Sequence, residues 1–156
     1  MSYFDSVIPF VLEHEGGYCN DEHDPGGETR YGICKREYPT LDIKNLTQDE
    51  AIFIYRRDYW KPYMDMMPYP LAAKLFDCSV NMGHSQANKL MQRAAGVEDD
   101  GIIGHESLEA INSQDEKELL ADFISHIKNF YANLVTRKPQ MAKFINGWNK
   151  RAGWTV

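Results

Sequence analysis

A carboxylate and a glycine-rich loop near the start of the chain have the residue types that glycoside hydrolysis requires. Glu15 is followed by Gly16-Gly17, and the loop after them contains Asp24 and Thr29. Cleavage of a glycosidic bond needs an acid that protonates the leaving oxygen, and a second group that acts as nucleophile or positions water. We interpret Glu15 as the acid, Asp24 as its partner and Thr29 as a hydroxyl that holds the attacking water.

Other carboxylates in the same region are alternatives for the second group. Asp21 is the main rival of Asp24, whereas Glu13 is two residues from Glu15 and projects from a different side of a helix. A glycine-rich loop that covers a carboxyl group at a helix end can partly desolvate it, as the proton donor of a glycosidase requires. The sequence leaves the carboxylate separation open, and with it the choice between inversion and retention.

Aromatic residues near these groups predict contacts with a sugar. Tyr18 and Tyr31 offer flat faces for pyranose rings, and the nearby glycines allow the backbone to approach a bound sugar. Tyr59 has two readings, as a residue lining the groove or as part of the core at the end of a helix. A glutamate before two glycines is also a common solvated helix end, so these residues alone leave catalysis open.

Metal and thiol chemistry are the competing interpretations. Four residues carry atoms that can bind zinc: His14, Cys19, His23 and Cys34. Their spacing matches no common zinc motif, so we expect neither a metal nor another cofactor. Cys78 near His84 could imitate a thiol peptidase, but it falls in an apolar helix, where a buried thiol is expected. A disulfide between Cys19 and Cys34 is left open.

The elements around the loop are predicted from apolar spacing and from capping residues. The first helix is expected to begin near Asp5 or Ser6, because Pro9 is tolerated in a first turn, and to end at Gly16-Gly17. Residues 29–33 are predicted to pair as a small hairpin.

A capping-box pattern opens the second predicted helix. Thr47 and Glu50 form this pattern, and the helix is expected to end near Tyr59. The later predicted helices cover residues 70–80, 85–95, 105–111, 114–137 and 141–150. We therefore expect a mainly α fold with a small irregular or β-hairpin lobe after the first helix. Residues 1–156 are expected to form one domain, in which residues 1–85 and 86–156 share a core.

The net charge of −6 argues against a broad nucleic-acid interface, and it requires any binding to an anionic cell wall to come from local contacts. No apolar run approaches the roughly 20 residues of a membrane span, so we expect no stable membrane insertion. Residues 1–5 lack the features of a secretory signal.

Motifs spread in order along the chain resemble glycoside hydrolase family 108, the phage and bacterial N-acetylmuramidases. The first motifs are Glu15-Gly-Gly-Tyr18, Asp24-Pro-Gly-Gly27 and Thr29-Arg-Tyr-Gly-Ile33. Later motifs are Tyr59-Trp60, Phe76-Asp77 and Asn81-x-Gly83. The companion peptidoglycan-binding region of the family is similar to Leu90-Met-Gln92, Asp100-Gly-Ile-Ile-Gly104 and Phe144-Ile-Asn-Gly-Trp148 with Arg151.

This resemblance implies a lysozyme-like fold and cleavage of the β-1,4 bond between N-acetylmuramic acid and N-acetylglucosamine. It implies that Glu15 is the catalytic acid and favours a substrate-binding role for Asn81 over a helix cap. The spacing of Glu15, Asp24 and Thr29 also resembles the catalytic set of T4-type phage lysozymes, except that the threonine there lies one residue further from the aspartate.

The implied partner is bacterial peptidoglycan, and we expect a monomer. A phage endolysin held in the host cytoplasm until a membrane pore releases it to the cell wall suits a chain without a signal. A bacterial enzyme exported by another route fits equally well. The alternative class is a non-catalytic protein on the same scaffold that binds the wall or assists secretion.

Overall fold

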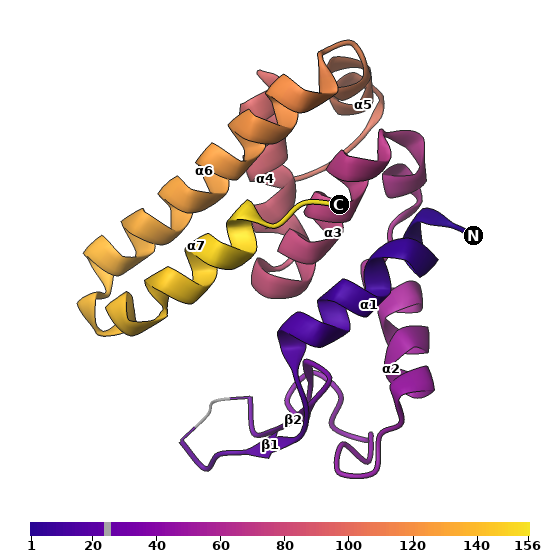
Figure 1. The fold of residues 1–156 in the computed structure, drawn as a ribbon, viewed down its shortest axis with the longest axis vertical. Helices are drawn as coiled ribbons and strands as arrows, with labels where there is room; N and C mark the ends of the chain where they lie inside the picture. The colour runs from indigo at the N-terminus through magenta and orange to yellow at the C-terminus, as the bar shows by residue number, and fades with distance from the viewer. Residues whose placement is uncertain (24–25) are drawn as a thin grey trace. The chain divides into compact units, whose positions relative to one another are not determined.

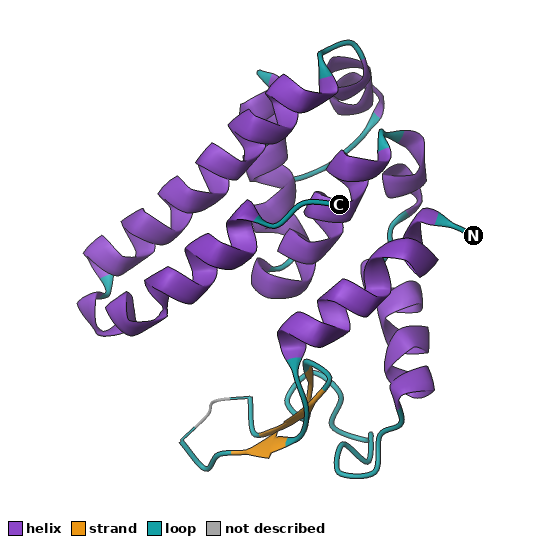
Figure 2. Ribbon diagram, viewed as in Figure 1, coloured by secondary structure: helices purple, strands orange, loops and turns teal. Residues whose placement is uncertain are grey.

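The computed structural model describes residues 1–23 and 26–156, which form two compact units, Met1–Trp60 and Lys61–Val156 (Figure 1). Helices dominate both units, and the strands lie in the first unit, directly after its first helix (Figure 2). The predicted mainly α fold with a small β lobe is confirmed. The prediction that the two halves share one core stays a prediction.

The first helix of the chain, α1 (Tyr3–Glu15), begins earlier than predicted. Ser2 is its N-cap: the Ser2 hydroxyl accepts a hydrogen bond from the Asp5 amide, and the Asp5 carboxylate accepts one from the Ser2 amide. This capping box fixes the start of α1, so Pro9 lies inside the helix and the prediction that places it in the first turn is wrong. Gly16, with φ of 73°, ends the helix as predicted.

A three-stranded antiparallel sheet follows α1, in the order β1 (Cys19–Asn20), β2 (Glu28–Arg30) and β3 (Ile33–Cys34). The hairpin predicted over residues 29–33 is confirmed as β2 and β3, whereas β1 was not predicted. Because β1 is only two residues long, its sequence shows no alternating pattern, and the strand is recognised by its pairing with β2.

The capping box at Thr47 and Glu50 starts α2 (Gln48–Ile54), as predicted. The helix continues to the predicted end at Tyr59, but as a π-helix, η1 (Tyr55–Tyr59). This wider turn is frequently found at functional sites, and it carries two tyrosines that lie close to the sheet lobe.

The second unit is a set of helices joined by short connections. It contains η2 (Pro62–Met66), α3 (Tyr69–Met82), α4 (His84–Ala95), α5 (His105–Asn112), α6 (Glu116–Arg137), η3 (Pro139–Phe144) and α7 (Ile145–Gly153). Each α-helix of this unit overlaps a predicted one. α3 is buried along most of its length, and packs against α4 and α6.

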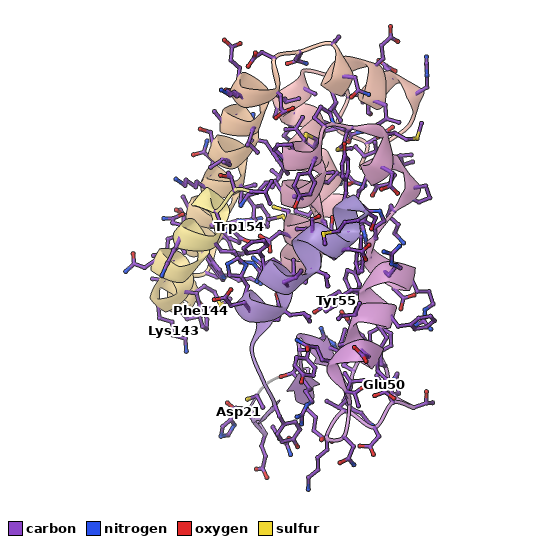
Figure 3. The ribbon with its side chains drawn as sticks, turned by 45° about the vertical axis from the view of Figure 1, so that its right-hand side comes forward. Asp21, Glu50, Tyr55, Lys143, Phe144 and Trp154 are labelled. Atoms are coloured by element: carbon purple, nitrogen blue, oxygen red, sulfur yellow. The ribbon has the colours of Figure 1, made fainter. Side chains whose placement is uncertain are left out.

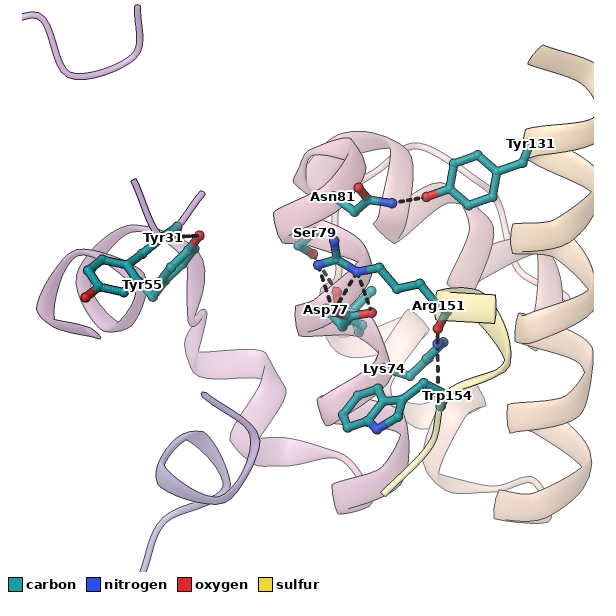
Figure 4. A network of polar contacts seen from close by, with 10 residues as sticks. Tyr31, Tyr55, Lys74, Asp77, Ser79, Asn81, Tyr131, Arg151 and Trp154 are labelled. Carbon is teal, nitrogen blue, oxygen red and sulfur yellow. Dashed lines mark hydrogen bonds and ion pairs between the residues drawn. The ribbon is translucent and has the colours of Figure 1, made fainter. Parts of the chain in front are cut away.

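Buried charged groups join α3 to the end of the chain (Figure 4). The Arg151 guanidinium donates to the Asp77 carboxylate at 2.9 Å, and both side chains are largely buried. Lys74, only 1% exposed, donates to the backbone carbonyls of Arg151 and Trp154, both at 2.8 Å. Burial lowers the pKa of Lys74, and Asp77 partly opposes that shift. These contacts fix the end of α7 on α3.

A buried glutamine organises the loop between α4 and α5. The Gln92 amide nitrogen donates to the Asp100 carboxylate, the Ile102 carbonyl and the Ser107 hydroxyl, and its oxygen accepts from the Gly101 amide at 2.8 Å. The peptidoglycan-region motif at residues 100–104 is therefore a loop that Gln92 holds through the Asp100 carboxylate and the backbone of Gly101 and Ile102.

Candidate active site

Glu15, the predicted proton donor, is the last residue of α1 and lies against the β2–β3 turn. A Cβ atom added to Gly32 would come within 2.8 Å of both Cγ and Oε2 of Glu15, closer than real Cβ atoms approach. The Glu15 side chain thus rests directly on the Gly32 backbone. A glycine is required at this position, and the close approach leaves the Glu15 side chain half-buried.

The turn that receives Glu15 consists of Tyr31 and Gly32, with φ of 52° and 78°. Positive φ at both central residues is the requirement of a two-residue type I′ hairpin, whose twist matches that of the strands it joins. Tyr31 is the one non-glycine residue with positive φ among residues 1–23 and 26–156. Such a conformation persists when surrounding contacts enforce it, and it often marks a functional site.

Tyr55, in the π-helix η1, supplies one of those contacts. Its hydroxyl donates to the Tyr31 carbonyl at 2.6 Å (Figure 4), and the same hydroxyl lies against the Cα of Gly32. The Tyr55 side chain is only 1% exposed, so its position is set by packing. Tyr55 and Gly32 therefore position Glu15, and neither role was predicted from the sequence. The one available signal was Tyr31-Gly32, a short turn between two β-forming residues.

Thr29 lies at the centre of β2, two residues before the turn. It pairs with Cys19 of β1 and with Cys34 of β3. Because side chains alternate along a strand, Thr29 faces the side of the sheet opposite to that of Glu28 and Arg30. Its predicted role, to hold the attacking water, stays a prediction.

Tyr18, predicted to contact sugar, lies on the Glu28 side of the sheet. Its hydroxyl donates to Glu28 Oε2 at 2.9 Å, and this hydrogen bond raises the pKa of Tyr18. The ring is 41% exposed and can still offer a face to a ligand. Tyr18 and Thr29 therefore lie on opposite faces of the sheet.

Tyr59 packs beside Tyr55, with 5.3 Å between the ring centroids. The Tyr59 hydroxyl donates to Glu37 Oε2 at 3.0 Å, and burial raises the pKa of Tyr59 above its ordinary value. The side chain supports the tyrosine that holds the turn. Direct contact between Tyr59 and substrate stays a prediction.

The predicted partners of Glu15 differ in how far the structure describes them. Asp24 lies outside the described residues. Its rival Asp21 is exposed, and its carboxylate accepts a hydrogen bond from the His23 amide at 2.9 Å, as in a local turn. Asn81, predicted to bind substrate, belongs to the second unit, within α3, and its amide donates to the Tyr131 hydroxyl, so its substrate-binding role stays a prediction. Tyr131 in turn stacks on Trp148 at 4.7 Å.

The cysteines are free thiols. Cys19 and Cys34 lie on the two outer strands of the sheet, each paired with Thr29. Two strand spacings separate their Cα atoms by roughly 10 Å, too far for a disulfide. Cys78 is buried, which raises its pKa to about 12 and disfavours the thiolate that a thiol peptidase needs.

Within the described ranges, no group of three His, Cys, Asp or Glu side chains is placed to hold a metal ion. In the same ranges, no helix combines the length and the apolar character that crossing a membrane demands. The expected absence of a cofactor stays a prediction.

Comparisons with known proteins identify the two regions of the chain. Residues 8–83 match the family model for glycosyl hydrolase 108, and residues 86–153 match the model for a predicted peptidoglycan domain. The solved structure of SagA from Brucella abortus is similar, with a TM-score of 0.82 and 28% sequence identity over 96% of this chain and 88% of that one. A search of curated proteins found no match.

The two family models cover the same stretches in which the ordered motifs occur, and Glu15, Tyr31 and Gly32 fall within the hydrolase match. The similarity to SagA supports the mainly α, lysozyme-like fold. The resemblance inferred from the motifs is confirmed. Residues 8–83 therefore belong to glycosyl hydrolase family 108 and are followed by a peptidoglycan domain, so the chain is a glycosidase that acts on peptidoglycan.

Proposed function

We propose that the protein is a lysozyme-type N-acetylmuramidase, which cleaves the β-1,4 bond between N-acetylmuramic acid and N-acetylglucosamine. Glu15 donates the proton to the leaving oxygen. The observation that carries this proposal is the seating of the Glu15 side chain on the Gly32 backbone, beside the Tyr55 hydroxyl. Such support fixes the carboxyl group in place, and a positioned acid is what proton transfer to a glycosidic oxygen needs.

Asp24 and Thr29 hold the attacking water in this proposal, with Asp21 as the alternative to Asp24. Thr29 is on the strand that leads into the Tyr31-Gly32 turn, so its backbone is tied to the same hairpin that supports Glu15. Replacement of each carboxylate by its amide distinguishes the two: the variant with the larger loss of turnover identifies the second group.

The test of the proton donor is Glu15→Gln, assayed by the release of reducing ends from purified peptidoglycan. The amide keeps the size of the side chain but cannot supply the proton, so we expect a fall in turnover of about 10²–10⁴-fold with wall binding intact. Glu13→Gln is the matched control, because Glu13 is exposed on the same helix and the substitution removes the same charge. Normal cleavage by Glu15→Gln would refute the assignment.

The cleavage products decide the bond. Mass spectrometry of the fragments should place the new reducing end on muramic acid. A reducing end on glucosamine would contradict muramidase activity, and new amino groups without reducing ends would indicate a peptidase. Tight binding without either product would favour a non-catalytic wall-binding protein.

We also propose that the enzyme serves as a monomeric phage endolysin, held in the host cytoplasm until it is released to the cell wall. Expression in the bacterial cytoplasm should leave the culture intact, and permeabilisation of the inner membrane should then cause rapid loss of turbidity. Lysis that needs no permeabilisation would contradict the release step, and a dimer in sedimentation would contradict the monomer.

A further inference from the structure

Basic and acidic residues are segregated along the chain. All 23 Asp and Glu residues precede residue 123, whereas six of the 17 Lys and Arg residues follow it. The segment 123–156 covers the later part of α6, then η3 and α7, all within the second unit. Lys143 and Phe144 lie together before α7 (Figure 3), with the ammonium group 5.0 Å from the ring centre. Although the whole chain has a net charge of −6, the segment 123–156 is basic and can attract an anionic polymer.

A cavity of about 690 Å³ lies between α4 and the basic half of α6, entirely within the second unit. This volume is within the range of sites for small ligands. Leu90 and Phe130 provide apolar surface, and Arg93 and Arg137 provide two guanidinium groups. None of the lining residues is acidic.

Four polar side chains of this cavity are not used by the fold. The side chains of Gln86, Asn129, Asn133 and Arg137 line it and form no hydrogen bond or ion pair with any residue that the structure describes. By contrast, the nearby buried amide of Gln92 is committed to the loop before α5. The cavity therefore presents amide and guanidinium groups that remain available to a ligand.

We propose that this cavity binds the peptide stem of peptidoglycan, an anionic peptide that carries several carboxylates. Arg137 and Arg93 pair with those carboxylates, the amides bind the peptide groups, and Leu90 with Phe130 contacts alanine methyl groups. This inference rests on the proposed function, because it names the part of the same substrate that the second unit recognises.

The chemistry of the cavity favours the stem over other wall components. Guanidinium groups match carboxylates in a planar, two-point geometry, whereas a neutral glycan offers them no charge. Arg93 already donates through Nε to Asp99 at 2.6 Å, so Arg137 is the stronger anchor. An anionic lipid surface would require an open basic face, whereas Arg93 and Arg137 line a cavity.

The test measures binding of a soluble disaccharide-tripeptide to the Glu15→Gln protein by calorimetry, which avoids cleavage. Loss of one charged hydrogen-bonding group should weaken binding, so we expect Arg137→Gln to raise Kd roughly tenfold. Arg137→Lys should give an intermediate value, because the charge remains while the two-point geometry is lost. Lys128→Gln is the matched control: it removes the same charge from the basic half of α6 but does not line the cavity.

Three results would overturn the proposal. The first is an equal loss of affinity in Arg137→Gln and Lys128→Gln, and the second is undiminished binding of the disaccharide that lacks the stem. The third is a protein that does not bind the stem but binds phosphatidylglycerol vesicles, with vesicle binding abolished by Arg137→Gln. Arg137 is exposed at the end of α6, so circular dichroism should show an unchanged fold. The readout does not depend on turnover, so failure here is distinguishable from failure of the muramidase assignment.

Discussion

The two units use polar side chains in opposite ways. In the first unit, the Glu15 carboxylate is half-buried at the end of α1 and rests on a turn of two residues. In the second unit, Lys74, Asp77 and Gln92 are almost wholly buried and hydrogen-bonded, Lys74 and Asp77 to groups near the end of the chain and Gln92 to the loop before α5. Burial with satisfied partners makes a rigid scaffold, whereas partial exposure keeps a group available for chemistry. Substitutions should therefore affect stability in the second unit and turnover in the first.

The largest effect is expected from Asp77→Asn. The amide removes the negative charge opposite Arg151 and near Lys74, which leaves buried positive charge without compensation. Loss of one partner of a buried pair costs about 3–5 kcal/mol, so the free energy of unfolding in urea should fall by that amount.

Asp99→Asn provides the matched control within the same unit. Asp99 also pairs with an arginine, Arg93, at 2.6 Å, but both side chains are more than 40% exposed. An exposed pair contributes about 0–1 kcal/mol, so the change should be small. Similar losses for the two variants would show that burial does not distinguish the two pairs.

An intermediate effect is expected from Gly32→Ala. The new methyl group would overlap the Glu15 side chain and the Tyr55 hydroxyl, and φ of +78° is strained for alanine. Strain of this kind costs about 1–3 kcal/mol, and displacement of a catalytic group by about 1 Å lowers turnover roughly 10²-fold. Urea denaturation and reducing-end release measure the two effects separately.

Gly27→Ala separates the strain from the overlap. Gly27 has a similar φ of +71°, but its added Cβ would lie 3.8 Å from the Lys35 Cβ, an ordinary contact. It should lose stability while keeping most of its turnover. Equal losses of turnover in the two variants would contradict the role of Gly32 as the seat of Glu15.

What the sequence predicted, and what it missed, follows from the range of the interactions involved. Helix boundaries set by local signals were predicted, such as the capping box at Thr47 and the end of α1 at Gly16. The contact between Glu15 and Gly32 was not, because it joins a helix end to a turn 17 residues away in sequence. The Tyr55 hydrogen bond to Tyr31 spans a longer separation and has no local signature. Glu15 itself was predicted from its motif, while its supports required the structure.

The position of Pro9 in α1 was predicted wrongly because two local sequence signals compete. Proline favours the first turn of a helix, but the Ser2–Asp5 capping box starts α1 earlier and overrides that preference. One missing amide in the interior of a helix is tolerable when the ends are fixed and one face is packed. Five residues of α1, Phe4, Val7, Ile8, Val11 and Leu12, are buried and provide that packing.

The smallest effect is expected from Asp5→Asn, which tests an exposed contact of the first unit against the buried pairs of the second. Hydrogen bonds from the Ser2 side chain and backbone, with a further one from Arg56, lower the pKa of Asp5 to about 2. A carboxyl group whose pKa is lower in the folded state stabilises the fold above its usual pKa near 3.8, and loses that contribution as the pH falls towards 2. The difference in unfolding free energy between the parent and Asp5→Asn should therefore be largest above pH 4 and shrink towards pH 2. Asp49→Asn controls for the loss of one charge, because Asp49 is exposed in the first turn of α2 and its carboxylate forms no hydrogen bond with any described residue. A difference that stays constant with pH would show that the Ser2–Asp5–Arg56 contact does not depend on the carboxylate.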